Sequence, residues 1–195
     1  MKRPMTLLGV GLGIATVIAA ACSDGVVTPR HEARAPFAHS PSMTHAHGVL
    51  TATDARMEAG DLDRLRELTA GYQDINVARN AGYTVQITGC MSDPQLGGMG
   101  VHFGNPDFID AKVEKFHPEV LLYEPQQDGT MRFVALEYIV PVDQWTLPHP
   151  PRLFGQDFHV IPEFGVWALH AWIAKDNPSG IFFDWNPNVS CQFAR

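Results

Sequence analysis

The fold is decided by two apolar runs, EVLLYE at residues 119–124 and MRFVALEYIV at residues 131–140. Gln126-Gln127-Asp128-Gly129 lies between them, and an Asp-Gly pair between apolar runs is a strong signal for a β-hairpin. The alternating residues of the second run form two predicted faces: Val134, Leu136, Tyr138 and Val140 on one, and Met131, Phe133, Ala135 and Ile139 on the other. A strand that is apolar on both faces is predicted to lie at the centre of a sheet.

A helix and two further strands are predicted around this hairpin. Apolar residues recur at three- and four-residue steps over 61–81, which predicts an amphipathic helix that ends at Gly82. Residues 83–88 alternate between apolar and polar side chains, as in a half-buried strand. Residues 166–174 form an aromatic strand that ends before the turn residues Asn177-Pro178-Ser179-Gly180.

These elements predict an α+β domain, in which one main amphipathic helix packs on a mainly antiparallel sheet. Seven of the 15 prolines and all four tryptophans lie from Pro141 onward. We therefore expect long loops rich in proline and aromatic residues in the last third of the chain.

The N-terminus has the layout of a signal peptide over residues 1–21, with Lys2 and Arg3 followed by an uncharged apolar stretch. The stretch ends in Ala19-Ala20-Ala21-Cys22, which resembles the lipobox of bacterial lipoproteins, although Ala19 stands where that family usually has Leu. The resemblance implies that Cys22 is lipidated and anchors the mature protein to a membrane. The alternative is ordinary cleavage after Ala21, which leaves a soluble exported protein with an unmodified Cys22.

After cleavage, residues 22–48 are predicted to be a flexible tether rich in His, Pro and Ser, and residues 49–195 a single globular domain. Cleavage removes two of the 14 basic residues and none of the 21 acidic ones, so the formal net charge falls from -7 to -9. No cluster of Lys and Arg remains to neutralise phosphates, which argues against nucleic-acid binding.

Two cysteines remain once Cys22 is assigned to the lipid anchor. Export places Cys90 and Cys191 in an oxidising compartment, where two cysteines usually pair, so we predict a disulfide between them. A zinc–thiolate site is the competing interpretation, but the two cysteines lack the close spacing of zinc motifs.

Three polar residues stand out as candidates for chemistry. Glu137 and His170 each interrupt an apolar strand, where a buried polar group needs a partner, and His102 lies beside the glycines of 97–100, where the backbone leaves room for a ligand. Two imidazoles and a carboxylate suit one divalent metal ion, zinc or iron, with an open coordination position. Each residue also has a structural interpretation, as an ion-paired glutamate, a hydrogen-bonded core histidine or a loop histidine. His159 is a fourth, weaker candidate.

The mature domain also resembles a group of uncharacterised exported bacterial proteins. The shared pattern is seen here as Gly100-Val101-His102, residues 118–125, Leu136-Glu137-Tyr138, residues 169–172 and residues 177–180. The resemblance implies export from a bacterial cell and brings no known activity.

Together these patterns predict an exported lipoprotein, anchored to a membrane of the bacterial cell envelope, whose domain binds a divalent metal or small ligand through His102, Glu137 and His170. Whether the protein is an enzyme stays open. The alternative is a non-catalytic envelope module, in which aromatic loops around Trp145, Trp167 and Trp185 bind a partner protein or a glycan.

Overall fold

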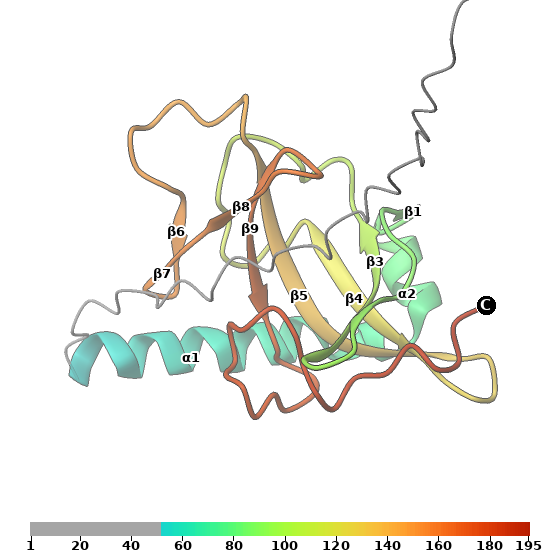
Figure 1. Cartoon of the computed structure of the whole chain (residues 1–195). Coiled ribbons are helices and arrows are strands. Elements are labelled where there is room, and N and C mark those ends of the chain that lie inside the picture. Colours follow the sequence, from blue (N-terminus) through green and yellow to red (C-terminus); the bar gives the residue numbers. More distant parts are fainter. Residues whose placement is uncertain (1–51) are drawn as a thin grey trace, which may run out of the picture. The chain divides into compact units, whose positions relative to one another are not determined.

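A computed structural model of the chain describes residues 52–195, with side chains from residue 55 onward. The predicted signal peptide, the lipidation site Cys22, the tether over 22–48 and the first residues of the predicted domain lie outside the described residues. The described part has the predicted α+β architecture, in which the helical segment packs against a mainly antiparallel sheet (Figure 1).

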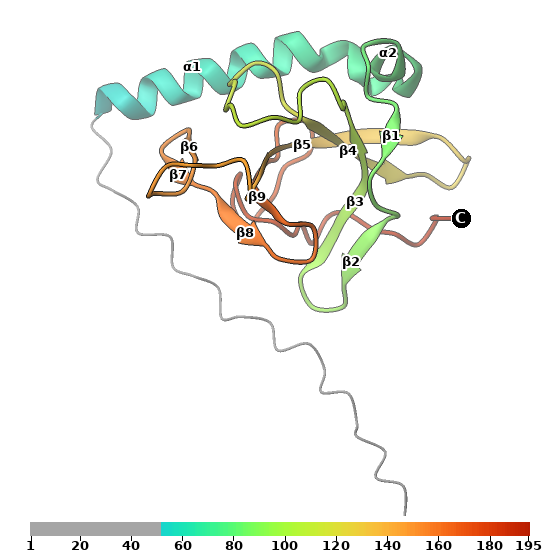
Figure 2. The same cartoon turned by 90° about the horizontal axis from the view of Figure 1, so that it is seen from above.

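The helical segment comprises α1 (Ala52–Thr69), the 3-10 helix η1 (Ala70–Gln73) and α2 (Ile75–Asn80). The strands are β1 (Val85–Gln86), β2 (Met91–Asp93), β3 (Gly97–Gly104), β4 (Val120–Pro125), β5 (Met131–Pro141), β6 (Arg152–Leu153), β7 (Gln156–Asp157), β8 (His159–Ile161) and β9 (Val166–Ala171). The main sheet has the order β1-β3-β4-β5-β9-β8, with β2 also paired to β3, whereas β6 and β7 form a separate hairpin. Figure 2 shows both α-helices on one side of the main sheet.

The helical segment differs from the single helix predicted over 61–81. It begins nine residues earlier, at Ala52, and is interrupted by η1. The interruption ends at Asp74, whose side chain accepts a hydrogen bond of 2.9 Å from the amide of Asn76 and so caps α2 as a separate helix. Gly82 follows α2 with a φ of 101°, as expected of a glycine that ends a helix.

The predicted hairpin is present as β4 and β5, and β5 is the predicted central strand, buried on both faces over most of its length. The register shifts by one residue along the pair: Tyr123 lies opposite Phe133, whereas Leu122 lies opposite Ala135. Val134 is the extra residue of this β-bulge. The bulge reverses the side-chain alternation, so Met131 and Phe133 share a face with Leu136, and the two faces predicted by strict alternation are wrong at Met131, Phe133 and Val134.

The sheet has an apolar core on each face. On the helix side, Leu65 of α1 packs with residues such as Leu136 and Tyr138 of β5. On the opposite face, Val120, Ala135 and Trp172 belong to a second cluster, which also includes Val189 near the C-terminus. The C-terminal segment therefore covers the face of the sheet that the helices leave free.

Strand β9 ends at Ala171, earlier than the predicted end at Ala174. The amide of Trp172 donates instead to the carbonyl of Ile181 at 2.8 Å, which binds the strand end to the loop that follows. Along this loop Phe182 packs against the helix-side core, whereas Trp185 packs against the core on the opposite face.

Candidate metal centre

Strand pairing brings His102, Glu137 and His170 together on the sheet face opposite the helices. Glu137 of β5 lies directly opposite His170 of β9. His102 of β3 pairs with Leu122 of β4, and Leu122 in turn pairs with Ala135, two residues before Glu137 on β5. Directly paired residues of antiparallel strands point to the same side of a sheet, so all three side chains enter the second apolar core.

The three side chains form a buried cluster with metal-binding composition. One nitrogen from each histidine and one carboxylate oxygen all lie within 4.8 Å of one another. Nε2 of His102 is 3.7 Å from Oε2 of Glu137, and Nε2 of His170 is 3.7 Å from Oε1. The exposed fractions are 4% for His102, 6% for Glu137 and 0% for His170, so bulk water does not solvate these groups.

Neither short contact within the cluster is a hydrogen bond. A separation of 3.7 Å exceeds the range in which an N–H group bonds an oxygen. Nε2 of His170 is moreover a buried atom with no hydrogen-bond partner in the structure. A buried polar atom without a partner is costly, and a cation bound between the two imidazoles and the carboxylate would remove that cost.

Two further residues contact the Nδ1 atoms of the histidines, on the side of each ring away from Glu137. Neither was predicted from the sequence as part of the site. Nδ1 of His102 lies 2.8 Å from the hydroxyl oxygen of Thr88, and Nδ1 of His170 lies 3.2 Å from Oδ1 of Asp184. Both rings therefore turn Nε2 toward Glu137. Such partners behind a metal-binding histidine fix the ring and its tautomer.

His159, the weaker candidate, contacts this outer layer. Its Nε2 lies 3.2 Å from Oδ2 of Asp184, so it does not join His102, Glu137 and His170 directly. An acidic residue within the aromatic sequence Phe182-Phe183-Asp184-Trp185 was the one available signal for Asp184.

The charges of the buried groups favour a cation. Burial, reinforced by the neighbouring His170, lowers the pKa of His102 to about 3, so this ring stays neutral near pH 7. Burial raises the pKa of Glu137. Burial acts to lower the pKa of His170, but the carboxylates of Glu137 and Asp184 outweigh it and raise that pKa. The carboxylates thus stabilise positive charge at His170, which either a proton or a metal ion can supply.

The glycines beside His102 have a different role from the one predicted. A Cβ atom on Gly97 would lie 2.2 Å from the carbonyl oxygen of Asn186, and one on Gly100 would lie 2.5 Å from that of Tyr123. Both glycines have a φ near 100°, a conformation that glycine adopts readily because it has no Cβ atom. They make room for the C-terminal segment and for β4, and not for a ligand.

The predicted disulfide is present between Cys90 and Cys191. It joins the segment before β2 to the C-terminal segment. Cys90 lies two residues after Thr88, and Cys191 lies seven residues after Asp184. A disulfide is compatible with an exported protein. Within residues 52–195, no helix is long and apolar enough to cross a membrane.

The three tryptophans of the alternative interpretation are partly buried. Trp145 and Trp167 pack against the helix-side core, and Trp185 packs against the opposite core. Binding of a partner protein or glycan through these rings stays a prediction.

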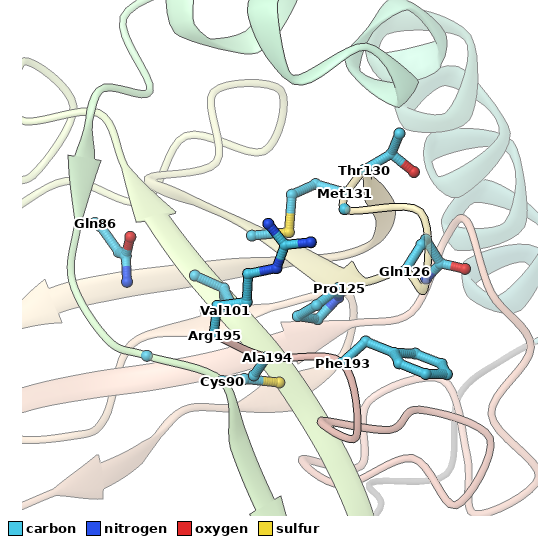
Figure 3. A pocket seen from close by; sticks show the side chains of 12 residues that line it. Gln86, Cys90, Val101, Pro125, Gln126, Thr130, Met131, Phe193, Ala194 and Arg195 are labelled. Carbon is cyan, nitrogen blue, oxygen red and sulfur yellow. The ribbon is translucent and has the colours of Figure 1, made fainter.

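A surface cavity of about 170 Å³ lies apart from the His–Glu cluster (Figure 3). Its wall includes Val101 of β3, Met131 of β5 and Arg195. None of the residues that line it belongs to the cluster, and neither Thr88 nor Asp184, which contact the histidines of the cluster, is among them.

Comparisons with protein-family models, with curated proteins and with solved structures find no match for this chain.

Proposed function

We propose that the domain binds one divalent metal ion through Nε2 of His102, the carboxylate of Glu137 and Nε2 of His170. The observation that carries this proposal is the buried, unpartnered Nε2 of His170, aimed at a carboxylate 3.7 Å away. Two neutral imidazoles and the carboxylates of Glu137 and Asp184 carry a total charge that a divalent ion neutralises. This balance matters because an uncompensated charge in a buried site is costly.

Two imidazoles, one carboxylate and an open position are the donor set of a catalytic zinc site, and zinc is the ion that we propose. Two donors that each lie about 2.1 Å from a metal ion are about 3.4 Å apart at the tetrahedral angle and about 3.0 Å apart at a right angle. The Nε2 atoms of His102 and His170 lie 3.7 Å from Oε2 and Oε1 of Glu137, respectively, and both distances are longer than either value, so the side chains would have to close slightly around an ion. Zinc held by three protein ligands keeps a fourth position for water or a small ligand.

Metal analysis of the exported protein, purified without chelators, tests this function. We expect about one zinc ion per chain, and loss of that ion in Glu137→Gln and His170→Ala. Glu119→Gln is the matched control, because Glu119 is also a buried glutamate but lies outside the cluster. Zinc at 100 times its dissociation constant should raise the free energy of unfolding by about 2.7 kcal/mol.

A folded protein that contains no metal, and whose melting temperature does not rise with zinc, iron or copper, would contradict the proposal. The cluster would then be a buried ion pair between a protonated His170 and Glu137. In that case Glu137→Gln should destabilise the protein strongly, since it leaves one charged partner buried alone.

We also propose that the protein is an envelope lipoprotein anchored through Cys22. The lipobox-like sequence supports this address, and the disulfide is compatible with an oxidising compartment. Cys22→Ser should move the protein from the membrane fraction to the soluble fraction and abolish incorporation of labelled palmitate. A variant that stays in the membrane fraction would show that the anchor lies elsewhere.

A further inference from the structure

Asp184 lies between two histidines, one of them inside the candidate metal centre. Oδ1 of Asp184 is 3.2 Å from Nδ1 of His170, and Oδ2 is 3.2 Å from Nε2 of His159. The side chain of His170 has no exposed surface, whereas those of Asp184 and His159 are about one third exposed. The three groups thus form a chain that runs from the buried cluster to the surface.

The chemistry of a carboxylate fixes the hydrogen-bonding state of His170. An ionised carboxylate only accepts hydrogen bonds, so Nδ1 of His170 must carry the proton that they share. When the ring is neutral, its lone pair is then on Nε2, the nitrogen that faces Glu137. Thr88 does not impose such a choice on His102, because a hydroxyl group both donates and accepts.

The backbone holds Asp184 in place although it lies outside a regular strand. Two residues further on, the backbone of Asn186 exchanges two hydrogen bonds of 3.0 Å with Gly98 of β3. The side chain of Asn186 also donates to the carbonyl of Asp176 at 3.1 Å. The disulfide at Cys191 fixes the same segment further along the chain. Asp184 is therefore supported by the sheet that carries the three proposed ligands.

We infer that Asp184 is a positioning residue of the metal centre: it holds His170 in the tautomer that presents the Nε2 lone pair to a bound divalent ion, and His159 holds Asp184 from the surface side. The inference rests on the proposed metal-binding function and assigns a role to two residues beyond the three ligands. Loss of such a partner typically weakens metal binding by 10- to 100-fold, roughly.

The test is Asp184→Asn, because an amide has nearly the same shape but can donate to Nδ1 as well as accept from it. Zinc affinity is measured by competition with a chelator, and the visible absorption bands of the cobalt-loaded protein report the ligand field. We expect zinc affinity to fall by roughly 10- to 100-fold, with a shift of the cobalt bands. Asp157→Asn is the control, since Asp157 is an exposed aspartate paired with Arg152.

If Asp184→Asn binds zinc with the affinity of the wild type and its cobalt bands do not shift, Asp184 is not a positioning residue, although the metal site itself stands. If the wild-type protein itself takes up neither zinc nor cobalt, the proposed function fails, and this inference fails with it. His159→Gln provides a second test if Asp184→Asn does not fold. It removes only the outer partner, so we expect a smaller loss of zinc affinity and a cobalt shift in the same direction; no change in either would count against the inference.

Discussion

Glu119 makes the stability of this domain depend on pH in an unusual direction. The residue is only 2% exposed, and its Oε2 accepts a hydrogen bond of 3.1 Å from the amide of Ile139. Burial raises its pKa from 4.5 to about 8, although backbone hydrogen bonds oppose the shift and the charges of Asp110 and Glu137 add to it. The folded state therefore holds a proton between pH 4.5 and pH 8 that the unfolded state releases.

A group with a raised folded-state pKa makes the protein less stable as the pH rises through that window. The expected slope is about 1.4 kcal/mol for each pH unit, so Glu119 alone lowers the free energy of unfolding by at most about 4 kcal/mol from pH 5 to pH 8. Glu119→Gln removes this contribution, because an amide does not ionise and still accepts the bond from Ile139. Its stability should therefore fall less steeply with pH than that of the wild type.

The measurement is urea denaturation of both proteins at several pH values from 5 to 8. The difference between the two curves isolates Glu119, because every other titrating group is present in both proteins. If the free energies of unfolding of the wild type and of Glu119→Gln change in parallel over this range, Glu119 does not hold a proton in the folded state, and its raised pKa is wrong.

Three further changes test how the C-terminal segment is held. Replacing Cys90 and Cys191 together by Ser opens a loop with a sequence separation of 101, so the free energy of unfolding in urea should fall by about 4.7 kcal/mol. A fall of less than about 1 kcal/mol would show that other contacts mainly hold the C-terminal segment. Gly97→Ala places a Cβ atom 2.2 Å from the carbonyl oxygen of Asn186 at a φ of 100°, so it should lower the melting temperature and reduce the free energy of unfolding by at least about 1–3 kcal/mol. Gly60→Ala is the control, because its Cβ atom meets no atom within 4 Å and should not destabilise the protein. Lys175→Met leaves the buried carboxylate of Glu124 without its ion-pair partner at 2.6 Å and should cost about 3–5 kcal/mol, much of which the double variant with Glu124→Gln should recover.

The sequence predicted the parts of the site that conflict with their local surroundings. Glu137 and His170 stand out because each interrupts an apolar strand, and the structure places them directly opposite each other. Thr88 and Asp184 could not be predicted in the same way. A threonine in an alternating strand and an aspartate in a loop are ordinary residues there, and their roles come only from long-range packing.

In the fold, too, the features that a local pattern marks could be predicted and the others could not. The hairpin, the central strand and the disulfide follow from local patterns and from cysteine chemistry, and all three are present. The break between α1 and α2 arises where Asp74 caps a new helix, which the apolar periodicity of 61–81 hides. The bulge at Val134 has no glycine or other turn residue to mark it.

That bulge decides which face of the sheet receives Glu137. Near the turn, Glu124 pairs with Arg132, and continuing this register without a bulge would put Leu136 opposite Val120. Leu136 would then enter the second core and Glu137 would point toward the helices, because a slip of one residue exchanges the two faces of a strand. The extra residue instead places Glu137 opposite Val120, on the same face as His170. The candidate metal centre therefore depends on an irregularity in the strand as well as on the identity of the three residues that form it.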